Sequence, residues 1–166
     1  MDIFTAIKRR HSVRYYSKKK IFRSLLEKIV DAGRYAPTAR GVQPWEFIVV
    51  SDAATVKALG EITDHGKFLS TANACIAVFS ADTKYYLEDC CAATQNILLA
   101  ATAVGVGSCW IAGDKKPYCP QINQLLGVPG QYKLVSLIAL GFPLLLKGLK
   151  PAARRPFEET VHWERF

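Results

Sequence analysis

The sequence predicts an α+β protein in which one sheet is covered by helices, in at most three layers. The chain has 166 residues, half of them apolar, which is the size and composition of one globular domain. It contains four short apolar runs typical of buried strands, separated by segments with helical periodicity. Two helical segments precede the first of these runs, so the strict β-α alternation of a doubly wound dinucleotide-binding fold is lacking.

The first 44 residues predict two helices joined by an extended segment. Apolar side chains recur at helical spacing in residues 2–9, and residues 12–16 are typical of extended chain. A second amphipathic helix runs over Leu25–Val30 and ends before Pro37, because a residue that precedes proline avoids the helical region. Residues 37–44 then predict a loop.

The remaining elements alternate between strands and helices. The strands are expected at 47–50, 74–80, 108–112 and 134–140, and the helices at 52–59, 84–104 and 120–126. Residues 143–166 show no periodicity and carry three prolines. Such a tail is either disordered or packed on another surface, and its large side chains favour packing: Phe157, Val161, Trp163 and Phe166.

The formal net charge of +8 indicates an anionic partner, although a solvated basic face accounts for it equally well. Nucleic acid, an acidic membrane surface and a phosphorylated small molecule all qualify. No nucleic-acid-binding motif is visible, so we expect no nucleic-acid partner. Residues 90–113 carry no charge, but they include polar residues and Gly105, so they predict a buried helix, a turn and a strand instead of a membrane span.

The five cysteines form no C-x-x-C pair and their number is odd, which argues against a disulfide framework. The three histidines are scattered, so no metal site is expected. No signal peptide is recognised at the start, and reduced, mostly buried thiols indicate a cytoplasmic protein.

One candidate binding segment is Arg10-His11-Ser12-Val13-Arg14. Alternate side chains of an extended segment share a face, which places Arg10, Ser12 and Arg14 together. Two guanidinium groups and a hydroxyl suit a phosphate, or a heterocycle that gains negative charge. A basic surface edge is the alternative interpretation.

Three further segments carry weaker signals. The loop 36–45 is stiffened by two prolines, and its Gly41 permits close backbone approach to a flat ligand. At the end of the strand 108–112, small residues would leave backbone N–H groups accessible at Ala112 and Gly113. The tail adds Arg154 and Arg155. Acid–base candidates are sparse, which agrees with chemistry carried by a cofactor.

Together these segments resemble the nitroreductase family of FMN enzymes, in order and spacing over nearly the whole chain. The motifs are Arg10-x-Ser12-x-Arg14, Ala36-Pro-Thr with Gln43-Pro-Trp45, the helix around Gln95-Asn96, Gly105-x-Gly-Ser-Cys-Trp, and Arg155-Pro-Phe-Glu-Glu-x-Val-His162-Trp163. The resemblance implies a central mixed, mainly antiparallel sheet flanked by helices. It also implies an intertwined homodimer, each chain being a single domain over residues 1–166 whose tail, 143–166, packs on the partner subunit.

The resemblance further implies FMN as the cofactor and NADH or NADPH as the electron donor. Arg10 and Ser12 would bind the phosphate and ribityl chain, with backbone contacts from His11. Arg14 would lie near the N1–C2=O edge, where a cation stabilises the anionic reduced flavin.

The other site residues implied by the resemblance come from three places. The partner's Pro37 and Thr38 would lie against the isoalloxazine ring, and backbone groups of Ala112 and Gly113 would reach the N5 side. Arg154, together with Arg155 or Lys150, would close on the phosphate.

The chain departs from the family pattern at two positions, having Gly41 where many relatives carry Asn and Ala112 where relatives often place an acid. The polar flavin-edge contacts of larger members have no clear counterpart, and His65 and Lys67 are the nominees for them.

The reaction implied is a ping-pong hydride transfer through flavin N5 from NAD(P)H to a small-molecule acceptor of the nitroaromatic, quinone or enone type. No residue of the chain is assigned as catalytic. The alternative is a non-catalytic flavin-binding protein, a sensor or a store, which would bind FMN with little NAD(P)H oxidation.

Overall fold

The computed structural model describes residues 1–144 and 152–166 and confirms the α+β class. In chain order the main elements are α1 Ile3–Arg9, α2 Arg23–Arg34, β1 Trp45–Val50, α3 Ala53–Ile62, β2 Ala74–Ser80, α4 Tyr86–Ala103, β3 Gly107–Ala112, α5 Cys119–Leu126 and β4 Lys133–Gly141. Short 3-10 turns lie at η1 Ala39–Gly41, η2 Lys67–Thr71 and η3 Phe157–Glu159. Each expected helix and strand is present, with boundaries that differ by a few residues.

Local chemistry accounts for where the helices begin and end. The Asp2 carboxylate accepts the Thr5 N–H (3.0 Å) at the start of α1, and Asp52 does the same for Thr55 (2.8 Å) at the start of α3. Gly127 ends α5 in the left-handed conformation (φ 66°), which glycine adopts without steric cost.

The strands form one sheet in the order β1-β2-β4-β3, and all three pairings are antiparallel. The expected mixed sheet is corrected in this respect. Within the described residues the parallel element is reduced to an isolated bridge between Ser12 and Ser108. The N-terminal segment lies alongside β3 there without forming a ladder.

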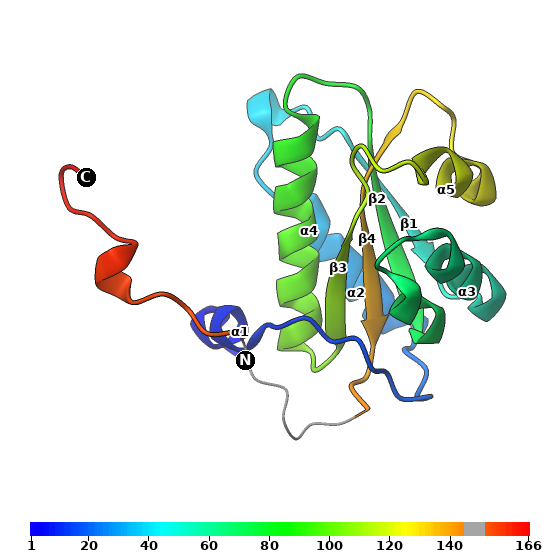
Figure 1. The fold of residues 1–166 in the computed structure, drawn as a ribbon, viewed down its shortest axis with the longest axis horizontal. Helices are drawn as coiled ribbons and strands as arrows, with labels where there is room; N and C mark the ends of the chain where they lie inside the picture. The colour runs from blue at the N-terminus through cyan, green and yellow to red at the C-terminus, as the bar shows by residue number, and fades with distance from the viewer. Residues whose placement is uncertain (145–151) are drawn as a thin grey trace.

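Helices cover both faces of the sheet, so the expected three layers are confirmed (Figure 1). On one face α2 and α4 pack through Ile29, Ile97 and neighbouring apolar residues. On the other, α3 and α5 pack through Leu59 and Ile122. Strands β2 and β4 lie between these two cores with nearly every residue buried. Burial of this apolar surface is the main stabilising contribution to the fold.

The two chain ends are placed differently. Residues 10–16 cross the end of the sheet, from the start of β3 to the residues after β4, whereas residues 152–166 extend away from the body and are exposed throughout (Figure 1). Pro143 bridges to Tyr16, so the first residues after β4 still pack on their own chain. Among the described helices, none has both the length and the hydropathy that a membrane crossing needs.

Candidate functional site

The candidate site begins with the segment 10–16, which is fixed against β3. The Val13 N–H donates to the Ser108 carbonyl (2.9 Å), and Val13 itself is 2% exposed. Its methyl groups occupy the space that a Cβ on Gly107 would need, since such an atom would lie 2.9 Å from them. Tyr16 is buried as well, and its hydroxyl donates to the Val13 carbonyl. The extended segment is therefore positioned by the core.

With Val13 pointing inward, the side chains on either side of it point outward, and Ser12 and Arg14 are exposed. Burial raises the pKa of the Cys109 thiol, while the charges of Arg14 and Arg10 and a hydrogen bond with Ser12 oppose that rise. Ser12 forms an isolated bridge with Ser108, the neighbour of Cys109 on β3, and Arg14 lines the same hollow as Cys109. The structure thus places Ser12 and Arg14 beside one stretch of β3.

Arg14 also borders a small hollow of about 170 Å³ beside β3. Its guanidinium carbon lies 5.7 Å from the ring centroid of Phe68, which holds the side chain by a cation–π contact. The hollow is further lined by His65, Trp110 and Ala112. Its volume is below the usual 300–1,000 Å³ of a ligand pocket, so one chain supplies only part of an enclosure.

Of the two nominees for a flavin-edge contact, His65 lines this hollow and Lys67 does not. The Lys67 ammonium donates instead to the Glu61 carbonyl (2.6 Å). Sequence reasoning missed Phe68 and Tyr118, which complete the wall. The Tyr118 hydroxyl donates to the Ala112 carbonyl and so fixes the exit of β3, a contact that no spacing in the sequence indicates.

Two buried polar atoms beside the arginine cluster have no partner among the described residues: Nε2 of His11 and Oγ of Ser108. The Nδ1 atom of His11 lies 2.8 Å from the Arg9 carbonyl, and since a carbonyl only accepts, Nδ1 carries the proton. Unpartnered buried polar atoms are rare in folded proteins and need an explanation. A polar ligand at this cluster would provide one.

At the end of β3 we expected the backbone N–H groups of Ala112 and Gly113 to be free for a ligand, and for Gly113 this is wrong. The Gly113 N–H donates to the Val135 carbonyl (3.1 Å), and the Asp114 N–H shares that acceptor (3.3 Å). A Cβ at position 113 would lie 2.8 Å from Leu134, so glycine is required by packing. Pairing with β4 thus continues past the end of the strand and occupies the Gly113 N–H, whereas Ala112 is exposed beside the hollow.

The loop that contains Pro37 and Thr38 is held in another part of the chain. The Thr38 hydroxyl donates to the Asp89 carboxylate (2.8 Å) and accepts the Gln43 N–H (2.9 Å). The Ala39 N–H donates to the other Asp89 oxygen (3.1 Å). Asp89 lies on α4, is 6% exposed, and is a third residue that sequence reasoning missed. Neither Pro37 nor Thr38 lines the hollow beside Arg14.

The tail arginines also lie apart from the N-terminal cluster. Arg154 donates to the Ala152 carbonyl (2.5 Å), and Arg155 donates to the carbonyl (2.7 Å) and carboxylate (3.5 Å) of Glu159. Both are exposed in the segment that leaves the body. The third nominee, Lys150, lies outside the described residues.

Comparison with known proteins identifies the relatives of this arrangement. The nitroreductase family model matches residues 7–72 and 65–142. A protein of Archaeoglobus fulgidus with the provisional name NADH dehydrogenase/NAD(P)H nitroreductase is 36% identical, over 95% of this chain and 94% of its own length.

Solved structures match nearly the full chain. A protein of Bacteroides thetaiotaomicron with the same provisional name has a TM-score of 0.91 and 29% identity, covering 99% of this chain and 98% of that one. A provisionally named nitroreductase of Desulfovibrio desulfuricans, solved in complex with FMN, has a TM-score of 0.82 and 27% identity, covering 100% and 98%.

Proposed function

The chain belongs to the nitroreductase family, and from this premise we propose that it is an FMN-dependent, NAD(P)H-oxidising enzyme that reduces nitroaromatic, quinone or enone acceptors by a ping-pong hydride transfer. The names of its relatives and the FMN bound in similar structures support the cofactor and the donor. The observation that carries the proposal is the position of Ser12 and Arg14 beside β3, where Ser12 pairs with Ser108 and Arg14 borders the hollow that Trp110 and Ala112 line.

The donor set at this point fits FMN. Two guanidinium groups and a hydroxyl match a phosphate, because they combine positive charge with several hydrogen-bond donors. Ser108 Oγ and His11 Nε2 have no hydrogen-bond partner among the described residues, and polar atoms of a bound ligand would provide one. The hollow beside Arg14 adds the aromatic surfaces of Trp110 and Phe68, which suit a flat heterocycle.

Each residue of the chain then has a stated task. Arg10 and Ser12 bind the phosphate and ribityl chain, with His11 adding backbone contacts, and Arg14 favours the reduced cofactor by offsetting the negative charge that it gains. Arg154, together with Arg155, closes on the phosphate. FMN held by these residues would supply the redox chemistry, the transfer of hydride from NAD(P)H to the acceptor.

The site is completed by a second copy of the chain. The hollow beside Arg14 is small, and Pro37 and Thr38 do not line it, because their loop is held by Asp89 elsewhere in the chain. In this arrangement the partner's Pro37 and Thr38, on a loop held in place by Asp89, would help to hold the flavin ring, and Ala112 would line its site from this chain, with Gly113 positioning Ala112 through its pairing with β4.

Exposed apolar surface supports such an interface. Helix α1 exposes Ile3, Phe4 and Ile7, and an apolar groove of about 420 Å³ runs between α1, α2 and α4. The tail exposes Phe157 and Trp163. Exposed apolar surface of this extent is typical of interaction sites. We therefore assign residues 152–166 of the expected tail 143–166 to the partner subunit, whereas Pro143 and Leu144 pack on their own chain.

The test is an absorbance spectrum of the purified protein, followed by anaerobic addition of NADH and then NADPH. A yellow protein that bleaches with a donor supports the enzyme and identifies the donor that it prefers. A yellow protein that neither donor bleaches supports the non-catalytic flavin-binding alternative. A colourless protein that cannot be loaded with FMN contradicts the proposal.

A further inference from the structure

A second cavity lies on the other side of the loop that follows β3, and we infer that it binds the adenosine phosphate half of the nicotinamide donor. The inference rests on the proposed function, because it assumes a dinucleotide whose nicotinamide ring meets the flavin. The cavity measures about 860 Å³, within the range of small-molecule sites.

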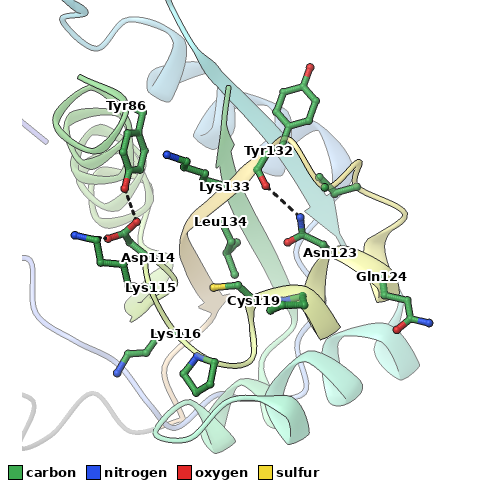
Figure 2. A pocket seen from close by; sticks show the side chains of 14 residues that line it. Tyr86, Asp114, Lys115, Lys116, Cys119, Asn123, Gln124, Tyr132, Lys133 and Leu134 are labelled. Carbon is green, nitrogen blue, oxygen red and sulfur yellow. Dashed lines mark hydrogen bonds and ion pairs between the residues drawn. The ribbon is translucent and has the colours of Figure 1, made fainter. Parts of the chain in front are cut away.

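The cavity is built by the loop after β3, helix α5, the loop 127–132 and the start of β4, and Tyr86 of α4 adds to its wall (Figure 2). Its floor is apolar where Leu134, Val128 and Cys119 line it. The Cys119 thiol donates to the Gly113 carbonyl (2.7 Å), and burial raises its pKa, so it lines the floor as a protonated thiol and not as a nucleophile. An apolar floor of this kind suits the face of a purine ring.

One side of the cavity is basic. Lys115, Lys116 and Lys133 come from the loop and from β4, and Figure 2 shows them on the side opposite Asn123. Lys133 pairs with Asp82 (2.6 Å) and Lys115 lies 3.7 Å from Asp114. Lys116 is half-buried and has no ion pair among the described residues. A positive charge therefore remains for an anionic ligand.

The carboxylate in this wall is already engaged. The Tyr86 hydroxyl donates to Asp114 (2.7 Å), and this hydrogen bond raises the pKa of Tyr86 to about 12. Tyr86 therefore stays protonated and keeps Asp114 occupied at neutral pH. Asp114 thus offers less repulsion to a phosphate than a free carboxylate would.

The opposite side of the cavity carries an unsatisfied acceptor. Asn123 on α5 donates through Nδ2 to the Tyr132 carbonyl (3.2 Å), which fixes the orientation of its amide. Its Oδ1 atom is buried and has no partner among the described residues. The exocyclic amino group of adenine is a donor that would satisfy it. Phosphate at the lysines and adenine at Asn123 together describe an adenosine phosphate.

The cavity adjoins the flavin hollow. Lys116 lines both, and the two lie on either side of the loop that begins at Gly113. A donor with its nicotinamide end beside Ala112 could therefore extend its other half past Lys116 into the larger cavity. The extra phosphate of NADPH would meet these lysines, so the cavity favours NADPH over NADH.

The direct test is calorimetric titration of the FMN-loaded protein with adenosine 2′,5′-bisphosphate. Replacing Lys115, Lys116 and Lys133 by Gln should weaken binding by roughly tenfold, since each exposed charge pair contributes little alone. A matched control replaces three exposed lysines elsewhere, Lys20, Lys28 and Lys57, and should change binding by less than about twofold at constant salt. The single variant Lys116→Gln serves if the triple variant does not fold.

The second arm measures anaerobic flavin bleaching with NADPH and with reduced nicotinamide mononucleotide, which lacks the adenosine half. The cavity variant should lose kcat/KM with NADPH and keep it with the mononucleotide. Unchanged bisphosphate binding in the cavity variant overturns the site. Weakened binding with unchanged NADPH kinetics overturns the assignment to the donor. Failure of the proposed function is distinct, because wild-type flavin would then bleach with neither compound.

Discussion

The two ends of the chain are alike in composition and opposite in placement. Both are irregular segments that carry arginines and large apolar side chains: Arg10, Arg14 and Tyr16 at one end, Arg154 and Trp163 at the other. The N-terminal segment buries Val13 and Tyr16 in the core beside β3. The C-terminal segment is exposed along its described length, and Trp163 is 77% exposed.

The difference shows which ligand contacts one chain can fix by itself. Arg10 and Arg14 belong to a segment held by a backbone hydrogen bond to β3 and by buried neighbours, so their positions are set before any ligand binds. Within the described part of the chain, Arg154 and Arg155 hydrogen-bond only to residues of their own tail. Their arrangement relative to a ligand requires a surface that the tail can pack on, which the proposed dimer supplies.

The largest effect is expected from removing the C-terminal end. Deleting residues 150–166 should convert the dimer to monomer or aggregate and abolish FMN retention, because the apolar contacts and arginines of the tail are lost together. Size-exclusion chromatography with light scattering and the flavin absorbance measure both properties. A truncated protein that remains a stable FMN-bound dimer would contradict the assignment of the tail to the interface.

A smaller effect is expected from single arginines, and it differs between the ends. Arg10→Ala should weaken FMN binding by about 1.5–3 kcal/mol, the contribution of a charge-assisted hydrogen bond. Arg154→Ala is the comparison and should weaken binding only under conditions that keep the dimer assembled. Fluorescence titration of the apoprotein with FMN gives both affinities. Unchanged affinity in the Arg10 variant removes Arg10 from the site.

The smallest effect concerns folding stability. Val13→Ala leaves a cavity beside Gly107 and should lower the free energy of unfolding by about 1–3 kcal/mol. Trp163 is exposed in its own chain, so Trp163→Ala removes little buried surface from the monomer. Its effect should therefore appear only as a change in dimer dissociation. Urea unfolding at several protein concentrations separates the two cases. An equal, concentration-independent loss in both variants would show that the tail is part of the monomer core.

Most of the fold could be predicted from the sequence because local patterns specify it. The apolar run 74–80 becomes β2 without a shift in boundary, and the spacing of Ile3, Phe4 and Ile7 becomes α1. The pairing of the strands could not be derived in this way, since periodicity says which residues are extended but not which strand lies beside which. The family resemblance implied a mixed, mainly antiparallel sheet, and the three strand pairings are all antiparallel.

The candidate site likewise contains residues that local sequence patterns predict and residues that only the structure reveals. The alternation Arg10, Ser12, Arg14 predicts three side chains on one face, and the structure places Ser12 against β3 and Arg14 at the hollow beside it. Asp89, Phe68 and Tyr118 were not found, because each acts on a residue far along the chain or through a backbone carbonyl. Such contacts leave no periodic signal in the sequence.

By itself, the sequence determined the class of fold, the elements and the family, because propensity, periodicity and motif order are properties of neighbouring residues. The tertiary structure decided the rest. It anchored Val13 beside Gly107, used the N–H of Gly113 within the sheet and fixed Thr38 on Asp89. These outcomes depend on which distant segments share a core, and burial sets that choice only once the whole chain has packed.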